Sequence, residues 1–234
     1  MAKHGGEPSS KGRRLTVDKA SFDRIIRRLP GIGQSLGPLF WLISKVELTD
    51  PHVILEIGTG MGGSLKFWEQ LVKPGDLVVS VDVEPDLKRI VWDYKGSDRK
   101  ILLIVGDSMD EKTVTAVKET LSGRSVDFLF IDGGHLYENV STDFRNYMPF
   151  VKVGGLVGFH DLSDPDVRKL FDELEGEKET SKSWMRPQRP LTTLPEKVGD
   201  DKFTADLKGI LDERWWLTGN NGLVCTGVWW KRHG

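Results

Sequence analysis

Two segments of the chain place an acid and a histidine directly after an apolar run. Asp132 and His135 follow the run Val126–Ile131, and His160 and Asp161 follow a later one. If both runs are parallel strands of one open sheet, their carboxyl ends share the edge at which such sheets bind ligands. Two carboxylates and two imidazoles gathered there can transfer protons or hold a cation.

A glycine-rich segment, Leu55–Gly63, follows an earlier apolar run. Gly58, Gly60 and Gly63 satisfy the spacing G-x-G-x-x-G, which lets a ligand approach the backbone at a strand-to-helix turn. Asp82 ends the next apolar run, where an acid can accept hydrogen bonds from a ribose diol. A tight turn without a ligand would explain the glycines alone, but Asp82 makes a nucleotide-like ligand the better interpretation.

Glu56 indicates which kind of ligand this is, because it precedes Gly58 by two residues in an apolar strand. A buried carboxylate is costly unless it is paired. The ammonium and sulfonium of S-adenosylmethionine would supply a partner, whereas a dinucleotide brings a pyrophosphate that needs a helix amino terminus. A nearby lysine is the alternative partner. Asp107 and Ser108, after the third apolar run, add polar groups suited to an adenine.

These residues require a sheet to hold them. Short apolar runs alternate with amphipathic stretches, which predicts right-handed βαβ units in a doubly wound, mostly parallel seven-stranded α/β sheet. The predicted parallel strands are Val53–Ile57, Leu77–Val81, Ile101–Val105, Val126–Ile131 and Leu156–Phe159. The helices between and after them are Ser64–Val72, Asp86–Tyr94, Glu111–Leu121, Tyr137–Tyr147 and about Asp166–Leu174. A C-terminal antiparallel hairpin is predicted from Trp215–Thr218 and Leu223–Trp230 around Gly219–Gly222.

The remaining segments divide the chain further. Residues 1–14 are polar and basic and are expected to be a disordered tail, followed by one domain over 15–234. Residues 15–50 carry two amphipathic stretches, Ser21–Leu29 and about Ser35–Leu48, which are predicted to be N-terminal cap helices. Periodicity is lost over 176–201, which is expected to be an irregular lid or loop.

Composition excludes several classes of protein. The 234 residues carry a net charge of −2, so no global field favours nucleic acid. A single cysteine, Cys225, suits a reducing compartment, and no apolar run reaches the length of a membrane span. We therefore expect a cytoplasmic protein without nucleic acid or membrane partners. Self-association into a homo-oligomer is left open.

The chain resembles class I S-adenosylmethionine-dependent methyltransferases. Glu56-x-Gly58-x-Gly60 is similar to their first motif, and Asp82 to their ribose acid. The resemblance implies a donor site made of Glu56, Gly58, Thr59, Gly60, Ser64, Asp82, Asp107, Ser108 and Asp132. Ser64 also suits a plain N-cap. The segment from Ile131 to Glu138, with Gly154-Gly155 and His160-Asp161, resembles the small-molecule O-methyltransferase group that includes macrolide-sugar O-methyltransferases and proteins of the cephalosporin-hydroxylase type.

This second resemblance implies roles for the acid and histidine pairs. It implies a divalent cation, Mg²⁺ or Mn²⁺, held by Asp132, His160 and Asp161. His160 departs from the relatives, which carry a carboxylate there; imidazole favours a transition metal over Mg²⁺. The resemblance also implies catalytic roles for Asp132 and for His135 as the base, since histidine titrates nearest to neutral pH. A helix-start histidine bonded to a carbonyl is the alternative.

The predicted function is therefore O-methylation of a small hydroxylated molecule, such as a sugar or secondary metabolite, with S-adenosylmethionine as the donor. Two alternatives stand beside it. One is a dinucleotide-dependent oxidoreductase, which Glu56 disfavours. The other is a cofactor-binding module without catalysis.

Overall fold

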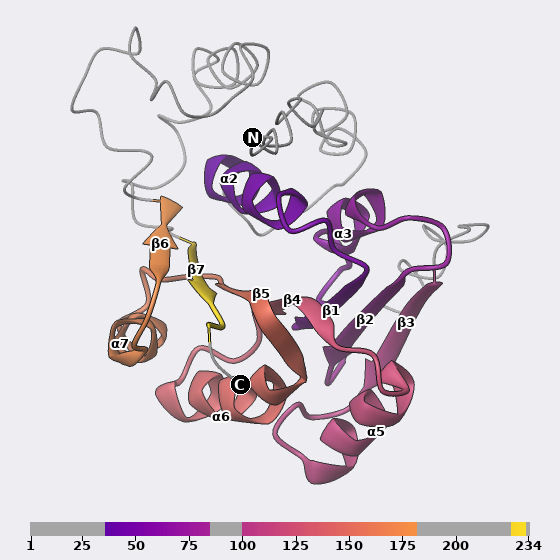
Figure 1. The fold of residues 1–234 in the computed structure, drawn as a ribbon. Helices are drawn as coiled ribbons and strands as arrows, with labels where there is room; N and C mark the ends of the chain where they lie inside the picture. The colour runs from indigo at the N-terminus through magenta and orange to yellow at the C-terminus, as the bar shows by residue number, and fades with distance from the viewer. Residues whose placement is uncertain (1–35, 85–99, 182–225, 233–234) are drawn as a thin grey trace, which may run out of the picture.

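The computed structural model describes residues 36–84, 100–181 and 226–232 (Figure 1). Its elements are α2 (Leu36–Glu47), β1 (Val53–Ile57), α3 (Leu65–Leu71), β2 (Leu77–Asp82), β3 (Lys100–Val105), α5 (Glu111–Leu121), β4 (Val126–Ile131), α6 (Tyr137–Tyr147), η1 (Met148–Phe150), β5 (Val151–Phe159), α7 (Pro165–Glu173), β6 (Lys178–Thr180) and β7 (Gly227–Trp230). The predicted tail, the first cap helix, the helix at 86–94 and the hairpin turn at 219–222 lie outside the described residues.

The strands form one seven-stranded sheet in the order β3-β2-β1-β4-β5-β7-β6. Strands β1 to β5 pair in parallel, while β7 is antiparallel to both β5 and β6. The chain moves outward from β1 to β3 and then returns to the other side of β1 with β4. The predicted doubly wound, mostly parallel sheet is thus confirmed, and β1 and β4 flank the switch point where such sheets bind ligands.

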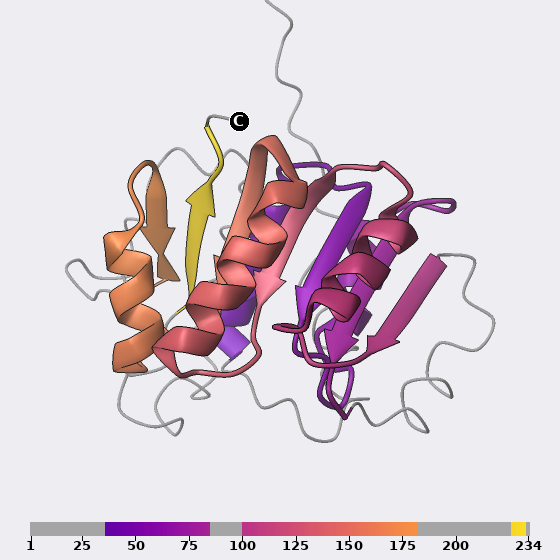
Figure 2. The same cartoon turned by 90° about the horizontal axis from the view of Figure 1, so that it is seen from below.

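Helices cover both faces of the sheet. In Figure 1, α2 and α3 lie on one face, and Figure 2 shows α5, α6 and α7 across the other. Strands β1 and β4 are buried along their whole length, as their uninterrupted apolar sequences require for a sheet covered on both faces. Each face has its own apolar core: Trp68 and Phe128 belong to one, and Leu129 and Phe144 to the other.

Helix α2 has a strongly apolar sequence, and Leu39 to Ile43 are all buried. It packs in the same core as α3, and the second predicted amphipathic stretch is therefore a helix in the structure. Across the described residues, no helix combines the length and the apolar character that crossing a membrane would demand.

The edge of the sheet differs from the prediction for residues 176–201. Lys178–Thr180 is a strand, β6, that pairs antiparallel with β7, so irregular structure was the wrong prediction for these three residues. An edge strand such as β6 pairs through its backbone on one side only, and neither of its faces is fully buried. Its sequence is therefore charged and lacks the alternation of apolar and polar residues that would predict a strand. β5 also begins earlier than predicted, at Val151, because an exposed stretch, Lys152–Gly154, precedes its buried half.

Candidate functional site

The sheet ladder continues one residue beyond three neighbouring strands and fixes the floor of the site. The amide N–H of Asp132 donates to the carbonyl of Ile57 at 2.8 Å, and that of His160 donates to Ile131 at 3.1 Å. On the other side of β1, Gly58 donates to the carbonyl of Val81 at 2.8 Å. The glycine turn, the acid after β4 and the histidine after β5 therefore stand in one row along the carboxyl edge.

The glycine turn after β1 is tied to the end of β2. Gly58 and Gly60 have positive φ values of 97° and 49°, as the predicted turn requires. The Asp82 Oδ2 atom accepts hydrogen bonds of 2.8 Å from the backbone N–H groups of both Thr59 and Gly60. The Thr59 hydroxyl points inward and lies 2.6 Å from the Ser80 hydroxyl. Asp82 thus shapes the turn as well as facing the cleft.

An open cleft of about 610 Å³ lies over this edge. It is lined by Ile57, Gly58, Thr59, Gly60, Met61, Gly63, Ser64, Val81, Asp82, Val83, Gly106, Asp107, Ser108, Met109, Asp132, Gly133, Gly134, His135, Asn139, His160 and Asp161. The structure therefore brings together every residue predicted for the donor site except Glu56, and all those predicted for catalysis and metal binding. The volume suits a small-molecule ligand.

Glu56 lies in β1 beneath the cleft and is 0% exposed. Its carboxylate accepts hydrogen bonds of 2.7 Å from the Trp68 indole N–H and 2.6 Å from the Ser80 hydroxyl, and Ser64 is a third donor. Burial raises the pKa of Glu56 to about 7, although these three donors lower it. No lysine or arginine among the described residues accounts for its charge, so the alternative of a lysine partner finds no support there.

Ser64 connects Glu56 to the cleft. It occupies the N-cap position of α3 with helical backbone angles, and its side chain makes no capping hydrogen bond. Its hydroxyl instead bonds Glu56, while the residue lines the cleft wall. Direct contact between Glu56 and a ligand stays a prediction, because the cleft lining contains Ser64 and not Glu56.

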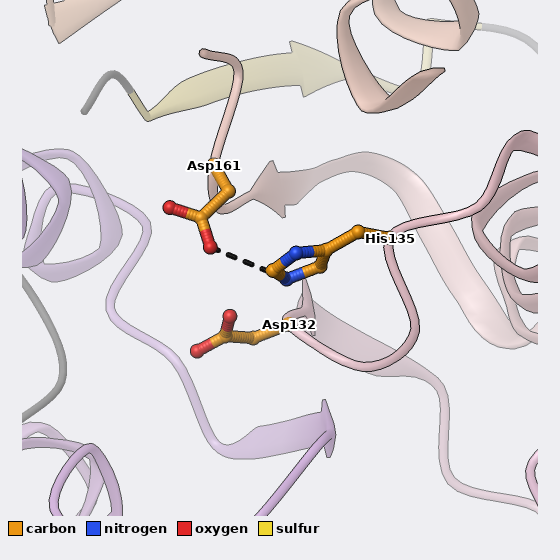
Figure 3. A group of neighbouring side chains, drawn as sticks. All are labelled: Asp132, His135 and Asp161. Atoms are coloured by element: carbon orange, nitrogen blue, oxygen red, sulfur yellow. Dashed lines mark ion pairs between the residues drawn. The ribbon is translucent and has the colours of Figure 1, made fainter. Parts of the chain in front are cut away.

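Asp132, His135 and Asp161 meet at the other end of the cleft (Figure 3). The His135 Nε2 atom lies 3.2 Å from Asp161 Oδ2, and the His135 side chain is 47% exposed toward the opening. Asp132, His135 and Asp161 each bring one potential ligand atom within 4.8 Å of the others. The group of possible metal ligands that the described structure brings together thus contains His135. The set predicted from the sequence contains His160 in its place.

His160 lies behind these residues, with a side chain that is 7% exposed. Its Nδ1 is 3.0 Å from Asp132 Oδ1 and 3.1 Å from Asp161 Oδ2, and neither contact has the geometry of a hydrogen bond. Burial lowers the pKa of His160, but the two carboxylates outweigh it and raise the pKa to about 10. Burial also raises the pKa of Asp161, yet His160 and His135 hold it below its usual range.

The comparisons with known proteins agree with this geometry. A family model described as a methyltransferase domain matches residues 55–162, which span the glycine turn and both acid and histidine pairs. Residues 55–162 are a methyltransferase domain.

Two relatives are similar in sequence to part of the chain. It is 31% identical over 143 residues to an uncharacterised protein of Acanthamoeba polyphaga mimivirus, covering 55% of this chain and 63% of that protein. It is 30% identical over 116 residues to demethylmacrocin O-methyltransferase of Streptomyces fradiae, covering 47% of this chain and 27% of that protein. The chain therefore spans less than two thirds of these relatives.

A solved structure shares the fold. The O-methyltransferase of Bacillus cereus, in complex with S-adenosylhomocysteine, superposes with a TM-score of 0.53 at 15% identity, covering 74% of this chain and 84% of that one. At this identity the likeness shows that the methyltransferase domain has the same architecture.

Two buried residues of the methyltransferase domain bond Glu56 but were not identified from the sequence. These residues are Trp68 and Ser80. Ser80 is the register partner of Glu56 in the pairing of β1 with β2. A polar residue within the apolar run of β2 was the one feature of the sequence that could have indicated its role. Asp143 of α6 is 1% exposed and lies beneath the loop after β4.

The Asp143 carboxylate is held close under Gly133, where an added Cβ would lie 3.3 Å from Asp143 Oδ2. Neither carboxylate oxygen has a hydrogen bond of good geometry within the described structure, although the Ser108 side chain lies near enough to influence it. Burial raises the pKa of Asp143 to about 6, with Asp107 adding to the effect. Asp143 therefore supports the cleft floor from below and does not line the cleft.

Proposed function

We propose that the methyltransferase domain transfers the methyl group of S-adenosylmethionine to a hydroxyl oxygen of a small molecule, such as a sugar or a secondary metabolite. The observation that carries the proposal is the position of His135, a half-exposed imidazole 3.2 Å from Asp161 at the end of a cleft whose other end is the glycine turn. The demethylmacrocin and Bacillus cereus relatives are O-methyltransferases by name, and the latter holds S-adenosylhomocysteine.

The donor would lie along the carboxyl edge of the sheet. Asp82 would accept hydrogen bonds from the ribose hydroxyls of the donor, and Asp107 and Ser108 would contact its adenine. Ser64, at the start of α3, would contact the amino-acid end of the donor. Glu56, buried beneath the cleft, would attract the positively charged donor through its negative charge. Gly58, Thr59, Gly60 and Asp132 would complete the wall of this donor site.

The chemistry is an in-line displacement. The acceptor oxygen attacks the methyl carbon, the C–S bond breaks, and sulfur takes the electron pair to give the neutral thioether of S-adenosylhomocysteine. The hydroxyl proton passes to His135, which Asp161 orients. Holding the acceptor and the methyl group in line is the main task of the cleft, and removing the proton is the second.

Titration calorimetry separates this proposal from the dinucleotide alternative. We expect S-adenosylhomocysteine to bind with a micromolar Kd and NAD⁺ not to bind at millimolar concentration. The reverse order of affinity would overturn the methyltransferase proposal in favour of an oxidoreductase.

A variant of His135 tests the base. We expect His135→Ala to keep the affinity for S-adenosylhomocysteine within about threefold while turnover falls by about 10²-fold or more. Turnover would be followed as S-adenosylhomocysteine release with a panel of glycosides and polyphenols. His52→Ala is the matched control, because His52 lies near the start of β1 with its side chain 57% exposed. Equal losses of affinity and turnover would assign His135 to donor binding instead, and donor binding by the wild-type protein without turnover on any acceptor would favour the non-catalytic module.

A further inference from the structure

We propose that Asp166 of α7 is a positioning residue that holds His135 against Asp161. This inference rests on the proposed function, because it assigns the group that keeps the proposed base in place. Asp166 is not among the residues that line the cleft, so it acts on the reaction through other residues.

The start of α6, two residues after His135, carries the first step. The N-cap residue of α6 is Leu136, whose side chain makes no capping hydrogen bond. Backbone N–H groups in the first turn of a helix need acceptors from outside the helix. Asp166 supplies one, because its Oδ2 atom accepts a hydrogen bond of 3.1 Å from the backbone N–H of Tyr137. Its negative charge also lies at the helix end where such a charge is favourable.

The start of α7 is tied in turn to Asp161. Asp164 is the N-cap residue of α7, and its Oδ1 atom accepts a hydrogen bond of 2.9 Å from the backbone N–H of Asp166. The backbone N–H of Asp164 donates to the carbonyl of Asp161 at 2.8 Å. This turn supports Asp161 at a φ of 48°, a left-handed conformation that is uncommon for residues other than glycine. Asp166 therefore stands on the same turn as the acid that contacts His135.

These contacts form a closed chain around the pair of His135 and Asp161. From Asp161 the chain passes through Asp164 to Asp166. From Asp166 it crosses to Tyr137 on α6 and returns along the backbone to His135. It closes where His135 Nε2 lies 3.2 Å from Asp161 Oδ2. The hydrogen bond between Asp166 and Tyr137 is the step that joins the two loops, so its loss should let the imidazole and the carboxylate move apart.

The side chain of Tyr137 strengthens the same junction. Helices α6 and α7 lie side by side on one face of the sheet (Figure 2). The Tyr137 hydroxyl donates to Glu173 Oε2 at 2.6 Å, and Lys169 Nζ lies 4.1 Å from the centroid of the Tyr137 ring. Asp166, Lys169 and Glu173 are spaced i, i+3 and i+7, so they share one face of α7. Tyr137 is thus held by α7 and belongs to the support of His135.

The loop that carries His135 needs such a support. Gly133 and Gly134 separate Asp132 from His135 and bring no side chains that could pack and fix the loop. The His135 side chain is itself 47% exposed. A base that must meet an acceptor in line with a methyl group gains from being held in one position.

Turnover in the presence and absence of His135 tests the proposal. We expect Asp166→Ala to lower kcat by about tenfold, while the KM for the acceptor and the Kd for S-adenosylhomocysteine change by less than about twofold. Asp166→Asn keeps an oxygen that can accept the Tyr137 N–H, and it should recover most of the rate. In a His135→Ala background, Asp166→Ala should lower the remaining rate by less than about twofold, because no base is left to position. Equal losses in both backgrounds would overturn the proposal.

Lys178→Met is the control for a general loosening of α7. Lys178 Nζ donates to the carbonyls of Phe171, Asp172 and Leu174 at 2.8, 2.9 and 2.8 Å, at the other end of the helix. We expect this variant to unfold at a lower urea concentration than the wild-type protein but to keep kcat within about twofold. A loss of kcat as large as that of Asp166→Ala would count against a specific role for Asp166. Asp166→Ser, whose hydroxyl is too short to reach Tyr137, replaces Asp166→Ala if that variant does not fold and should show the same loss.

Amide hydrogen exchange tests the same hydrogen bond without an acceptor. By NMR, the Tyr137 amide should exchange about tenfold faster or more in Asp166→Ala than in the wild-type protein, and near the wild-type rate in Asp166→Asn. Unchanged exchange in Asp166→Ala would contradict the proposal. Absence of wild-type turnover on every acceptor would count against the proposed function and this inference together. Wild-type turnover that Asp166→Ala leaves unchanged would count against this inference alone, so the two failures are distinguishable.

Discussion

Gly58 lies directly against the backbone of Asp132. A Cβ atom added to Gly58 would be 2.1 Å from the Asp132 carbonyl oxygen and 2.5 Å from its carbonyl carbon. The turn after β1 and the loop after β4 are therefore in contact through their main chains. This contact brings the glycine end and the acid end of the cleft together.

A pair of alanine variants separates close approach from backbone conformation. Gly58→Ala should lower the free energy of unfolding by roughly 3 kcal/mol or more, because the methyl group meets backbone that cannot move aside. Gly60→Ala should cost about 1 kcal/mol, since its φ of 49° is strained for alanine but nothing lies within 4 Å of the new atom. Urea unfolding measures both, and equal losses would refute the contact argument.

The charge of Glu56 should favour the cationic donor over its neutral product. Because the pKa of Glu56 is about 7, the carboxylate is ionised at pH 8.5 and mostly protonated at pH 6. The ratio of S-adenosylmethionine to S-adenosylhomocysteine affinity should therefore rise by about tenfold between these pH values in the wild-type protein. In Glu56→Gln the ratio should stay flat. Calorimetry with both ligands measures it, and an unchanged slope in the variant would remove Glu56 as the cause.

Asp143 should make the protein less stable as pH rises. Its folded pKa of about 6 exceeds the usual 3.8, so the unfolded chain releases this proton first. The free energy of unfolding then falls between about pH 4 and pH 6, by on the order of 1–3 kcal/mol, and stays low above that window. Asp143→Asn should make the fall smaller by this amount, leaving the part that comes from the raised pKa of Glu56, and should exceed the wild-type stability at pH 7.5. Thermal unfolding from pH 4 to pH 8 checks it; an identical slope in both proteins would show that another group is responsible.

Asp161 should affect turnover more than donor binding. Asp161→Asn removes the charge that orients His135, and we expect turnover to fall by roughly 10- to 100-fold while the Kd for S-adenosylhomocysteine changes little. Asp172→Asn, which disrupts a surface pair with Arg168, is the control and should leave both values unchanged. A large loss of donor affinity in Asp161→Asn would mean that this acid holds the donor.

The sequence predicted the buried elements better than the exposed ones. The bounds of β1, α5, β4 and α6 match the prediction because apolar periodicity marks every turn or strand that packs in the core. β6 was missed because a short edge strand is held by backbone hydrogen bonds alone, which leave no pattern in side chains.

Within the site, the sequence identified which residues gather at the edge but not how they pair. Which strand lies beside β1, and in which register, determines that Ser80 meets Glu56, and no local pattern contains that register. Asp143 could have been recognised as buried, since it shares a helix face with Val140, Phe144 and Tyr147. The placement of the His160 ring between two carboxylates depends on side-chain packing, which spacing does not encode.

The ladder bonds that hold Asp132 and His160 have a consequence for how selectivity can change. Groups fixed by the sheet cannot shift to fit a different acceptor without disrupting strand pairing. Met61, Val83 and Met109, by contrast, are exposed apolar side chains along the cleft. Adaptation to a new acceptor should therefore accumulate in these and other rim residues, while the chemistry beneath them is inherited unchanged.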